Sequence, residues 1–390
     1  MPILWRKIIC PFCFHRYKAS EVAYRCGNSR CTREEDTTFG TERGLRPASM
    51  GHVFRGAKKG AIRDAIITDT EAGCDLCGQP SRKRICPHCH FELSHDAGLI
   101  KDHAIAVIGG RGTGKGHYIA TLVHRLENEL GSQFNFSLRM LGDETRSRFE
   151  EDYRTPLLRE GKLLQPTQSA VNDSRVKSPM IFRLTLNRHR QAVNLSFFDS
   201  AGEDMQSLDT MSTEARYICA AAGIIFLLDP LQIDAIRQQV PVSMQPTRDV
   251  KADPVNIVER LRELFERQHS LKATKKVKTP VAFVLSKIDT LFSILDPSSG
   301  LRGAGEHFGH FNLRDSQSIH TEIRTYLDSW MGAGFSNRVD SDFVNYRFFG
   351  VSSLGRAPTR QGRVDSIAPI RVEDPFFWLL HQFGLIEGRK

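Results

Sequence analysis

The chain has 390 residues, of which 40% are hydrophobic and 25% charged, and 54 Lys and Arg outnumber 45 Asp and Glu to give a net charge of +9. This ordinary globular composition excludes a wholly disordered, collagen-like or coiled-coil protein. The longest apolar runs, residues 218–228 and 281–285, are shorter than the roughly 20 residues of a membrane-spanning helix. Because residues 1–7 also lack a signal-peptide pattern, we expect a cytoplasmic protein without a membrane span.

The first 90 residues contain eight of the nine cysteines, all in close pairs. In a reducing cytosol such pairs favour metal thiolates over disulfides, and two pairs complete a closed tetrahedral Zn²⁺ site. The spacing therefore predicts two structural Zn²⁺ ions, with the ligands Cys10, Cys13, Cys26, Cys31, Cys74, Cys77, Cys86 and Cys89. Sequential pairing along the chain is the simplest arrangement, and an interleaved one, in which the first and third pairs share a metal, stays open. The neighbouring His15, His88 and His90 are expected to be bystanders.

The same region carries most of the basic excess. Residues 1–101 hold 17 basic and 11 acidic residues, an excess of +6 out of the total of +9. We predict a zinc-ribbon module at residues 1–101 and a second domain at residues 102–390. The module lacks a dense basic run with interleaved aromatic residues, which favours a protein partner over nucleic acid. The sequence gives no indication of the oligomeric state.

From residue 103 onward, short apolar runs alternate with stretches of helical periodicity. The predicted strands are residues 103–108, 134–141, 180–186, 193–198, 223–228, 281–285 and 347–351. The clearest predicted helices are residues 118–130, 255–268, 318–331 and 375–383, and the predicted loops are residues 144–177, 241–253 and 296–312. This alternation predicts an α/β fold with a mainly parallel sheet that helices cover on both faces.

A glycine-rich loop follows the first predicted strand and precedes the first predicted helix. It fits the pattern GxxxxGK with Gly109, Gly110, Arg111, Gly112, Thr113, Gly114, Lys115 and Gly116. Such glycines let successive backbone amides surround a phosphate at a helix N-terminus, and Lys115 would reach the β and γ phosphates. The pattern requires Ser or Thr after the lysine to bind Mg²⁺, and Gly116 has no side chain for this role.

A second element follows the predicted strand at residues 193–198. Asp199 ends this strand and Gly202 comes three residues later. P-loop proteins hold Mg²⁺ through such a carboxylate and sense the γ phosphate with the backbone amide of such a glycine. Together with the glycine loop, this element predicts the P-loop NTPase fold.

A third element follows the buried strand at residues 281–285, where Ser286, Lys287 and Asp289 form an S-K-x-D pattern. A carboxylate at this position can accept two hydrogen bonds from the N1 and N2 groups of guanine, while the stem of the lysine packs over the base. Adenine offers no such pair of donors. The third element therefore predicts a preference for GTP over ATP.

In this order the three elements resemble those of the translation-factor-related (TRAFAC) class of GTPases, over residues 102–383. Ser286 replaces the usual Asn or Thr. The long interval between the first two elements is similar to that of bacterial double-GTPase (DO-GTPase-like) proteins from gene neighbourhoods linked to biological conflict. The resemblance implies GTP or GDP with Mg²⁺ as ligands, a role in bacterial defence, and a fifth motif at Ser352 and Ser353 that contacts the guanine oxygen.

The resemblance also suggests three residues for hydrolysis. Glu203 stands where Ras-like enzymes carry the glutamine that orients the attacking water. Arg111 could supply a positive charge to the transferred phosphoryl group, and a solvated arginine is the alternative. A threonine should close over Mg²⁺ and the γ phosphate, and we choose Thr167 with Thr155 as the rival.

The predicted function is a GTP-binding protein, a slow or regulated GTPase switch that signals through its zinc module. Gly116 should weaken nucleotide binding, and it fits a natural weak GTPase, a pseudo-GTPase or a laboratory substitution equally well. Two alternatives stay open. The first is a non-hydrolysing pseudo-GTPase scaffold, and the second is a nucleic-acid-binding NTPase.

Overall fold

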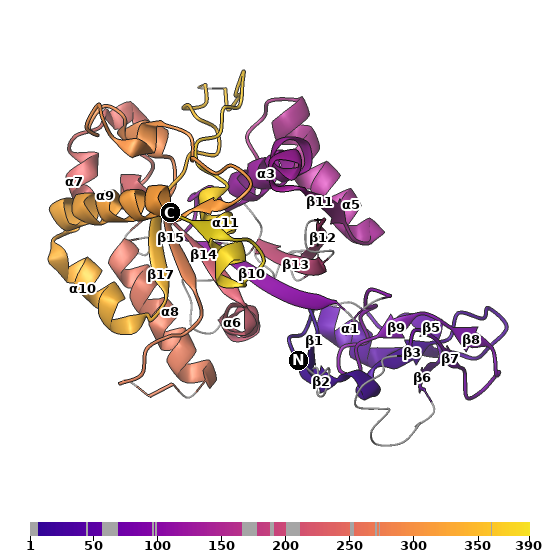
Figure 1. The fold of residues 1–390 in the computed structure, drawn as a ribbon. Helices are drawn as coiled ribbons and strands as arrows, with labels where there is room; N and C mark the ends of the chain where they lie inside the picture. Colours follow the sequence, from indigo (N-terminus) through magenta and orange to yellow (C-terminus); the bar gives the residue numbers. More distant parts are fainter. Residues whose placement is uncertain are drawn as a thin grey trace.

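The computed structural model describes residues 7–43, 46–56, 69–95, 97, 100–165, 178–187, 191–199, 211–249, 253–269, 271–272, 274–359 and 361–390. It consists of a small N-terminal part, here called the cysteine module (the described residues between 7 and 97), and a larger part around one central sheet (Figure 1). None of the described helices combines the length and the apolar character that crossing a membrane requires.

The central sheet has seven strands in the order β11-β12-β13-β10-β14-β15-β17. Their bounds are β10 Lys101–Gly109, β11 Phe136–Met140, β12 Met180–Leu186, β13 Gln191–Asp199, β14 Gly223–Leu228, β15 Val281–Leu285 and β17 Tyr346–Gly350. The strands from β13 to β17 pair in parallel, and β11 and β12 add an antiparallel edge. The predicted α/β fold with a mainly parallel sheet is therefore confirmed.

Both faces of the sheet are covered, because successive strand residues belong to different hydrophobic clusters. In β14, Ile224 and Phe226 join one cluster, and Ile225 and Leu227 join the other. The first cluster includes residues of α6 Met211–Ala220, α7 Asp234–Arg237, α8 Pro254–His269, α9 Leu313–Met331 and α10 Ala333–Asp342. The second includes residues of α3 Lys115–Arg125, α4 Gly131–Phe134, α5 Asp143–Phe149 and α11 Asp374–Gln382.

Several short elements complete the larger part. The chain forms π-helical segments at Leu126–Leu130 and Glu150–Arg159, and 3-10 turns at Pro230–Gln232, Val242–Met244, Ile288–Leu291 and Gly300–Arg302. Two further strands, β16 Phe311–Asn312 and β18 Gly388–Arg389, pair in parallel outside the central sheet.

The expectation of a loop at residues 144–177 is wrong over its first part, because α5 and the second π-helical segment occupy residues 143–159. Phe149, Tyr153 and Leu157 recur at every fourth position, and all three are buried in the core. Charged residues between them and a proline at position 156 concealed this amphipathic pattern in the sequence. The segment therefore adds a helical layer beside α3.

The cysteine module is built from short antiparallel ladders. Its elements are β1 Lys7–Ile9, β2 Arg16–Lys18, a 3-10 turn at Ala19–Glu21, β3 Ala23–Arg25, β4 Arg33–Glu35, α1 Thr37–Arg43, β5 Ser49–Gly51, β6 Val53–Arg55, β7 Ala72–Gly73, β8 Pro80–Ser81 and β9 Arg84–Ile85. Strand β3 is central to one ladder, with β6 on one side and β9 on the other. Figure 1 shows the module at the start of β10, to one side of the central sheet.

Candidate functional site

The glycine loop joins the end of β10 to the start of α3, as the sequence predicted. Two of its glycines, Gly112 and Gly114, have positive φ angles of 73° and 87°. A Cβ atom on Gly109 would lie 2.5 Å from the carbonyl oxygen of Leu227 on the neighbouring strand β14. These positions accept only glycine without strain, and they bring the loop amides to the N-terminus of α3, where a phosphate can bind.

Lys115 is the first residue of α3 and is only 5% exposed. Its Nζ donates hydrogen bonds to the carbonyl oxygens of Gly109 at 3.0 Å and Gly110 at 3.1 Å. The loop carbonyls therefore hold the ammonium group at the loop. This is a suitable position for a lysine that binds a terminal phosphate.

The other side chains of the loop differ in what they can offer. The hydroxyl of Thr113 is buried and donates to the carbonyl oxygen of Gly110 at 3.0 Å. Gly116 is the second residue of α3 and carries no hydroxyl. Arg111 is exposed on the loop. A magnesium ion at this loop would therefore receive no ligand from position 116.

The expected Mg²⁺ carboxylate, Asp199, ends β13. Its backbone pairs in register with Val107 of β10, two residues before the glycine loop. The end of β13 therefore reaches the same edge of the sheet as the loop. The side chain of Asp199, together with Thr167, Gly202 and Glu203, lies outside the described residues.

The rival threonine, Thr155, is described. It lies in the second π-helical segment, where its hydroxyl donates to a side-chain oxygen of Glu150 at 3.5 Å. This partner is within the same helical segment, and Thr155 does not line the cavity described below. The structure thus gives Thr155 a local role.

The S-K-x-D element begins directly after β15. Lys287 has a positive φ of 53°, and its Nζ lies 2.7 Å from Oδ2 of Asp229, which is 2% exposed. The other oxygen of Asp229 accepts the backbone N–H of Leu231 at 3.0 Å. Sequence reasoning missed Asp229. Its signal was an apolar strand that ends in an aspartate, the same signal that identified Asp199.

Ser286 occupies the position where related elements carry Asn or Thr. Its backbone N–H and its hydroxyl both donate to the carbonyl oxygen of Leu228, at 2.9 and 3.1 Å. The residue is buried. Ser286 therefore ties the end of β15 to the end of β14, which places Lys287 beside Asp229.

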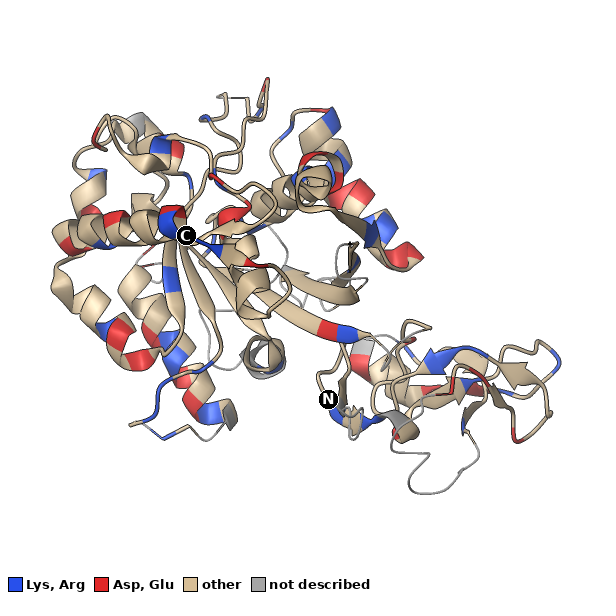
Figure 2. Cartoon of the chain, in the orientation of Figure 1, with Lys and Arg blue, Asp and Glu red and all other residues tan. Residues whose placement is uncertain are grey.

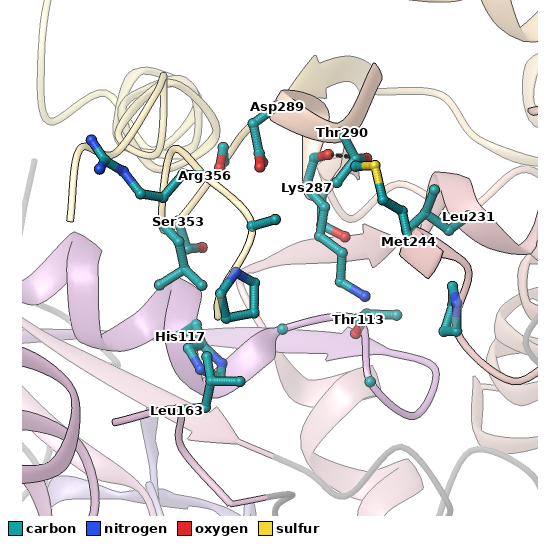
Figure 3. Close-up of a pocket in the computed structure, with 18 of the residues that line it drawn as sticks. Thr113, His117, Leu163, Leu231, Met244, Lys287, Asp289, Thr290, Ser353 and Arg356 are labelled. Atoms are coloured by element: carbon teal, nitrogen blue, oxygen red, sulfur yellow. Dashed lines mark hydrogen bonds between the residues drawn. The ribbon is translucent and has the colours of Figure 1, made fainter. Parts of the chain in front are cut away.

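A cavity of about 430 Å³ lies where the glycine loop meets the S-K-x-D element. Its walls come from the loop, from the S-K-x-D element, from the turn near Met244 and from the residues after β17. They include Gly112, Thr113, Gly114, Ser286, Lys287, Asp289, Thr290, Ser352, Ser353, Leu354 and Arg356. Figure 3 shows Lys287 and Asp289 on one side of this cavity, Thr113 on the loop, His117 on α3, and Ser353 and Arg356 opposite. The volume is within the range of small-molecule sites.

The predicted fifth motif lies at this cavity. Ser352 is 1% exposed and pairs through its backbone with Ile370, at 3.0 and 2.8 Å. Its hydroxyl accepts the backbone N–H of Gly355 at 2.8 Å. Both Ser352 and Ser353 line the cavity. The strand after β15 therefore brings its following residues to the same place as Asp289.

His117 is a cavity residue that sequence reasoning missed. It lies on the first turn of α3, and its Nε2 accepts the backbone N–H of Leu164 at 3.2 Å. Burial, and to a smaller extent the charge of Lys287, lowers the pKa of His117 to about 4. The imidazole is therefore neutral at pH 7, as its acceptor role requires.

The eight predicted metal ligands form two clusters in which all four sulfur atoms lie within 4.8 Å of one another. One cluster contains Cys10, Cys13, Cys86 and Cys89, and the other Cys26, Cys31, Cys74 and Cys77. Sulfur–sulfur distances are 3.6, 3.7, 3.7 and 4.0 Å. Four sulfurs at Zn–S bonds of about 2.3 Å in a tetrahedron would be about 3.8 Å apart, so both clusters fit Zn²⁺.

The grouping of the cysteines differs from both arrangements that the sequence suggested. The first pair shares a cluster with the fourth, and the second pair with the third, so the sites are nested. The antiparallel β3–β9 ladder explains this, because it pairs Ala23 with Ile85 and Tyr24 with Arg84. Cys26 and Cys86, which follow the two strands, therefore lie at opposite ends of the ladder.

The three neighbouring histidines are outside both sulfur clusters. His15 and His88 are exposed and stack on each other, with ring centroids 4.4 Å apart. His90 Nδ1 lies 2.9 Å from the carboxylate of Asp36. All eight side chains of the two clusters are cysteines. A zinc site closed by four thiolates would stabilise structure without offering an open position for catalysis.

One further group of potential ligands lies in the larger part, where His307, Asp315 and Asp374 come together. The guanidinium group of Arg371 supplies the positive charge there, because its Nη1 lies 2.9 Å from Asp315 and 2.8 Å from Asp374. Ion pairing with a buried arginine explains this cluster.

Comparison with known proteins identifies the family of this chain and a relative that matches almost its whole length. A family model described as "Double-GTPase 2" matches residues 103–352. A protein of Mycolicibacterium smegmatis (strain ATCC 700084 / mc(2)155), named "Putative ESX-1 scaffolding and assembly protein SaeC", is 28% identical over 402 residues, which cover 97% of this chain and 99% of that protein.

Two solved structures of GTPases are also similar, although weakly. The first is the bacterial selenocysteine-specific elongation factor EF-Sec, with 12% identity, a TM-score of 0.27, and coverage of 73% of this chain and 29% of that chain. The second is the Arl6 BBS3 small GTPase from Trypanosoma brucei with bound nucleotide analogue GppNp, with 11% identity, a TM-score of 0.31, and coverage of 73% and 98%.

Proposed function

Because this chain belongs to the Double-GTPase 2 family, we propose that it is a GTP-binding protein that works as a slow or regulated GTPase switch and signals through its cysteine module. In this proposal residues 102–390 form the nucleotide-binding domain, and residues 1–101 form a zinc-binding interaction module. The family supports GTP binding itself, and the regulation and the signalling are the new parts of the proposal.

One observation carries the proposal: the glycine loop and Asp289 line the same cavity. The loop offers backbone amides at a helix N-terminus, which suit phosphate. The carboxylate of Asp289 is half-buried and has no hydrogen-bond partner among the residues that the structure describes. It is therefore available to accept the N–H groups of guanine, while Lys287 is fixed beside it by Asp229.

We propose slow hydrolysis because of what surrounds the phosphate position. Lys115 is present, but Gly116 supplies no hydroxyl to Mg²⁺. Asp199 and Thr167 would then provide the protein ligands of the ion, which stabilises the phosphate charges. Gly202 would contact the γ phosphate and Glu203 would orient the attacking water. A missing ligand lowers the affinity for the metal–nucleotide complex, which suits a switch that a partner regulates.

The cysteine module suits a protein partner better than nucleic acid. Figure 2 shows Lys and Arg interspersed with Asp and Glu along the module. Two of its arginines have internal roles, because Arg25 pairs with Asp36 at 2.6 Å and Arg84 is fully buried. The relative from M. smegmatis, which matches almost the whole chain, carries the name of a scaffolding and assembly protein. We therefore propose that the module docks a protein during the assembly of a larger complex.

The test is to purify the full chain, release any bound nucleotide and identify it by chromatography and mass. We then measure the affinities for GTP, GDP and ATP. Guanine nucleotides should bind at least about 100-fold more tightly than ATP, since two charge-assisted hydrogen bonds distinguish the bases. Equal binding of ATP would contradict the proposal.

Measurement of turnover separates the alternatives. A switch hydrolyses GTP slowly on its own and faster with its partner. Retained GTP without any turnover would identify the non-hydrolysing scaffold instead. Turnover that rises when DNA or RNA is added would identify a nucleic-acid-binding NTPase.

A further inference from the structure

Three turns of the cysteine module share one backbone geometry. Each is a C-x-x-C sequence whose next residue has a positive φ, and these residues are Phe14 at 61°, Gly78 at 68° and His90 at 57°. In each turn the N–H of this residue donates to the carbonyl oxygen of the first cysteine, at 3.0, 2.8 and 3.0 Å. The turn itself therefore requires left-handed backbone at this position.

Glycine suits this position and a bulky side chain does not, because Cβ then crowds the following carbonyl oxygen. Gly78 shows that the turn can be built without a side chain. His90 uses its side chain, since Nδ1 lies 2.9 Å from Asp36. The left-handed backbone of Phe14 is therefore strained, and such strain often marks a functional position.

The ring of Phe14 leaves the module and packs against the larger part. Its centroid is 5.0 Å from that of Phe198 and 6.2 Å from that of Tyr217. Phe198 and Tyr217 stack on each other at 4.9 Å, and each is 5% exposed. Phe14 is half-buried in this contact and belongs to the hydrophobic cluster on that face of the sheet.

The two aromatic partners of Phe14 lie on consecutive described elements of the chain, β13 and α6. Phe198 directly precedes Asp199 on β13, and Tyr217 lies on α6, the first described helix after it. Between them lie Gly202 and Glu203, to which the proposed function assigns the contact with the γ phosphate and the attacking water. Phe14 therefore contacts the described elements on both sides of Gly202 and Glu203 in the sequence, β13 before them and α6 after them.

We propose that Phe14 is a positioning residue for the stacked pair Phe198 and Tyr217, through which the Cys10–Cys89 site and the γ phosphate influence each other. The inference rests on the proposed function. The ring is fixed on the module side by the C-x-x-C turn, so its place depends on the metal site. A change from GDP to GTP that displaces the end of β13 beside Asp199 alters the fit between Phe14, Phe198 and Tyr217. By linkage, the metal site must then affect GTP and GDP binding unequally.

The test compares wild-type chain with Phe14→Gly, in the presence of zinc. Glycine removes the ring and also relieves the left-handed strain, so the turn should fold as it does at Gly78. We measure zinc per chain by native mass spectrometry and the affinities for GDP and for a non-hydrolysable GTP analogue. We expect two zinc ions in both proteins and a ratio of the two affinities that changes by roughly fivefold or more. Phe14→Tyr, which keeps the ring, should retain the wild-type ratio.

His90→Gly is the control, because it makes the same backbone change in the equivalent turn of the same cluster. The side chain of His90 lies at Asp36 within the module, whereas the ring of Phe14 lies at Phe198 and Tyr217. Its affinity ratio should equal that of the wild type. Tyr217→Leu removes the ring on the other side of the same contact. The double variant Phe14→Gly with Tyr217→Leu should have the same affinity ratio as either single variant.

The outcomes are distinct. Suppose that the wild-type chain binds guanine nucleotides, and that Phe14→Gly and Tyr217→Leu have the same ratio of GDP and GTP affinities as the wild type. This result overturns the inference about Phe14 and leaves the proposed function standing. An equal change in His90→Gly also overturns it, since the effect would then belong to the turn and not to the ring. A wild-type chain that binds no guanine nucleotide overturns the proposed function, and the inference with it.

Discussion

The ammonium group of Lys287 lies 2.7 Å from the carboxylate of Asp229. The lysine is partly exposed at the cavity, whereas Asp229 is buried at the end of β14. A buried carboxylate that faces a lysine restricts the side chain of the lysine to one direction. The base recognition that we propose for Asp289 should therefore depend on a residue that follows a different strand and belongs to none of the predicted motifs.

Asp229→Asn should weaken the binding of both GTP and GDP by about tenfold, or ~1.4 kcal/mol, because Lys287 loses a charge-assisted hydrogen bond. Asparagine retains the oxygen that accepts the N–H of Leu231, so the strand end should keep its shape. Titration calorimetry measures the effect. Asp234→Asn is the control, since its ion pair with Arg248 is exposed. An equal loss of affinity in both variants would contradict the role of Asp229.

Asp289→Asn should lower the affinity for GTP by roughly 100-fold, about 3 kcal/mol, because two hydrogen bonds to an ionised acceptor are lost. The amide of asparagine can donate to the carbonyl group that xanthine carries in place of the amino group of guanine. Xanthosine triphosphate should therefore bind the variant better than GTP. Competition against a fluorescent nucleotide provides the measurement, and an unchanged order of the two nucleotides would argue against Asp289 as the guanine acceptor.

Gly116→Thr should increase the affinity for GTP in the presence of Mg²⁺ and leave the affinity in EDTA nearly unchanged. The added hydroxyl would supply the ligand that the glycine loop now lacks. Gly116→Val adds a side chain of similar size without a hydroxyl and serves as the control. If the threonine and valine variants behave alike in Mg²⁺, the position does not contribute to metal binding.

Zinc content tests the nested grouping of cysteines. Cys10→Ser with Cys89→Ser should lose one zinc ion per chain, because both residues belong to one cluster. Cys10→Ser with Cys26→Ser should lose both ions. Sequential pairing predicts the reverse result for the two double variants, and native mass spectrometry of the intact chain distinguishes them.

Burial lowers the pKa of His117 from 6.5 to about 4. Between these values the unfolded chain binds a proton that the folded chain does not. The free energy of unfolding should therefore fall as the pH falls from 6.5 towards 4, by at most about 1.4 kcal/mol per pH unit for this residue. Urea unfolding at pH 7, 6 and 5 measures this slope.

In His117→Gln the slope should be smaller, since glutamine does not titrate. His320, whose pKa burial also lowers to about 4, contributes in the same direction, so His320→Gln should reduce the slope as well. If His117→Gln kept the full wild-type slope, folding would not lower the pKa of this histidine, and the prediction would be wrong.

The features that could be predicted from the sequence are those that depend on residues close together in the chain. The strands at residues 180–186, 223–228 and 281–285 match the observed bounds, because runs of buried residues between turn residues are a local signal. The glycine loop was predictable for the same reason, since strand, loop and helix follow one another directly. The eight cysteines that gather in the two sulfur clusters were likewise visible in their spacing.

What the sequence did not reveal depends on contacts between distant segments. The grouping of cysteines follows from the β3–β9 ladder, whose strands are about 60 residues apart in the sequence. Asp229 and His117 acquire their roles only when two strand ends and a helix meet at the cavity. The helical residues 143–159 were hidden because charged side chains separate the few apolar ones that face the core.

The nested cysteine sites also suggest an order of assembly. In the inner site, Cys31 and Cys74 are 43 residues apart, and in the outer site Cys13 and Cys86 are 73 apart. Loop-closure entropy favours the shorter connection, and once the inner site has closed, the chain that the outer site must still close is much shorter. The module should therefore fold from the inside outwards. The turn that carries Phe14 belongs to the outer site, so its contact with Phe198 should form last and open first.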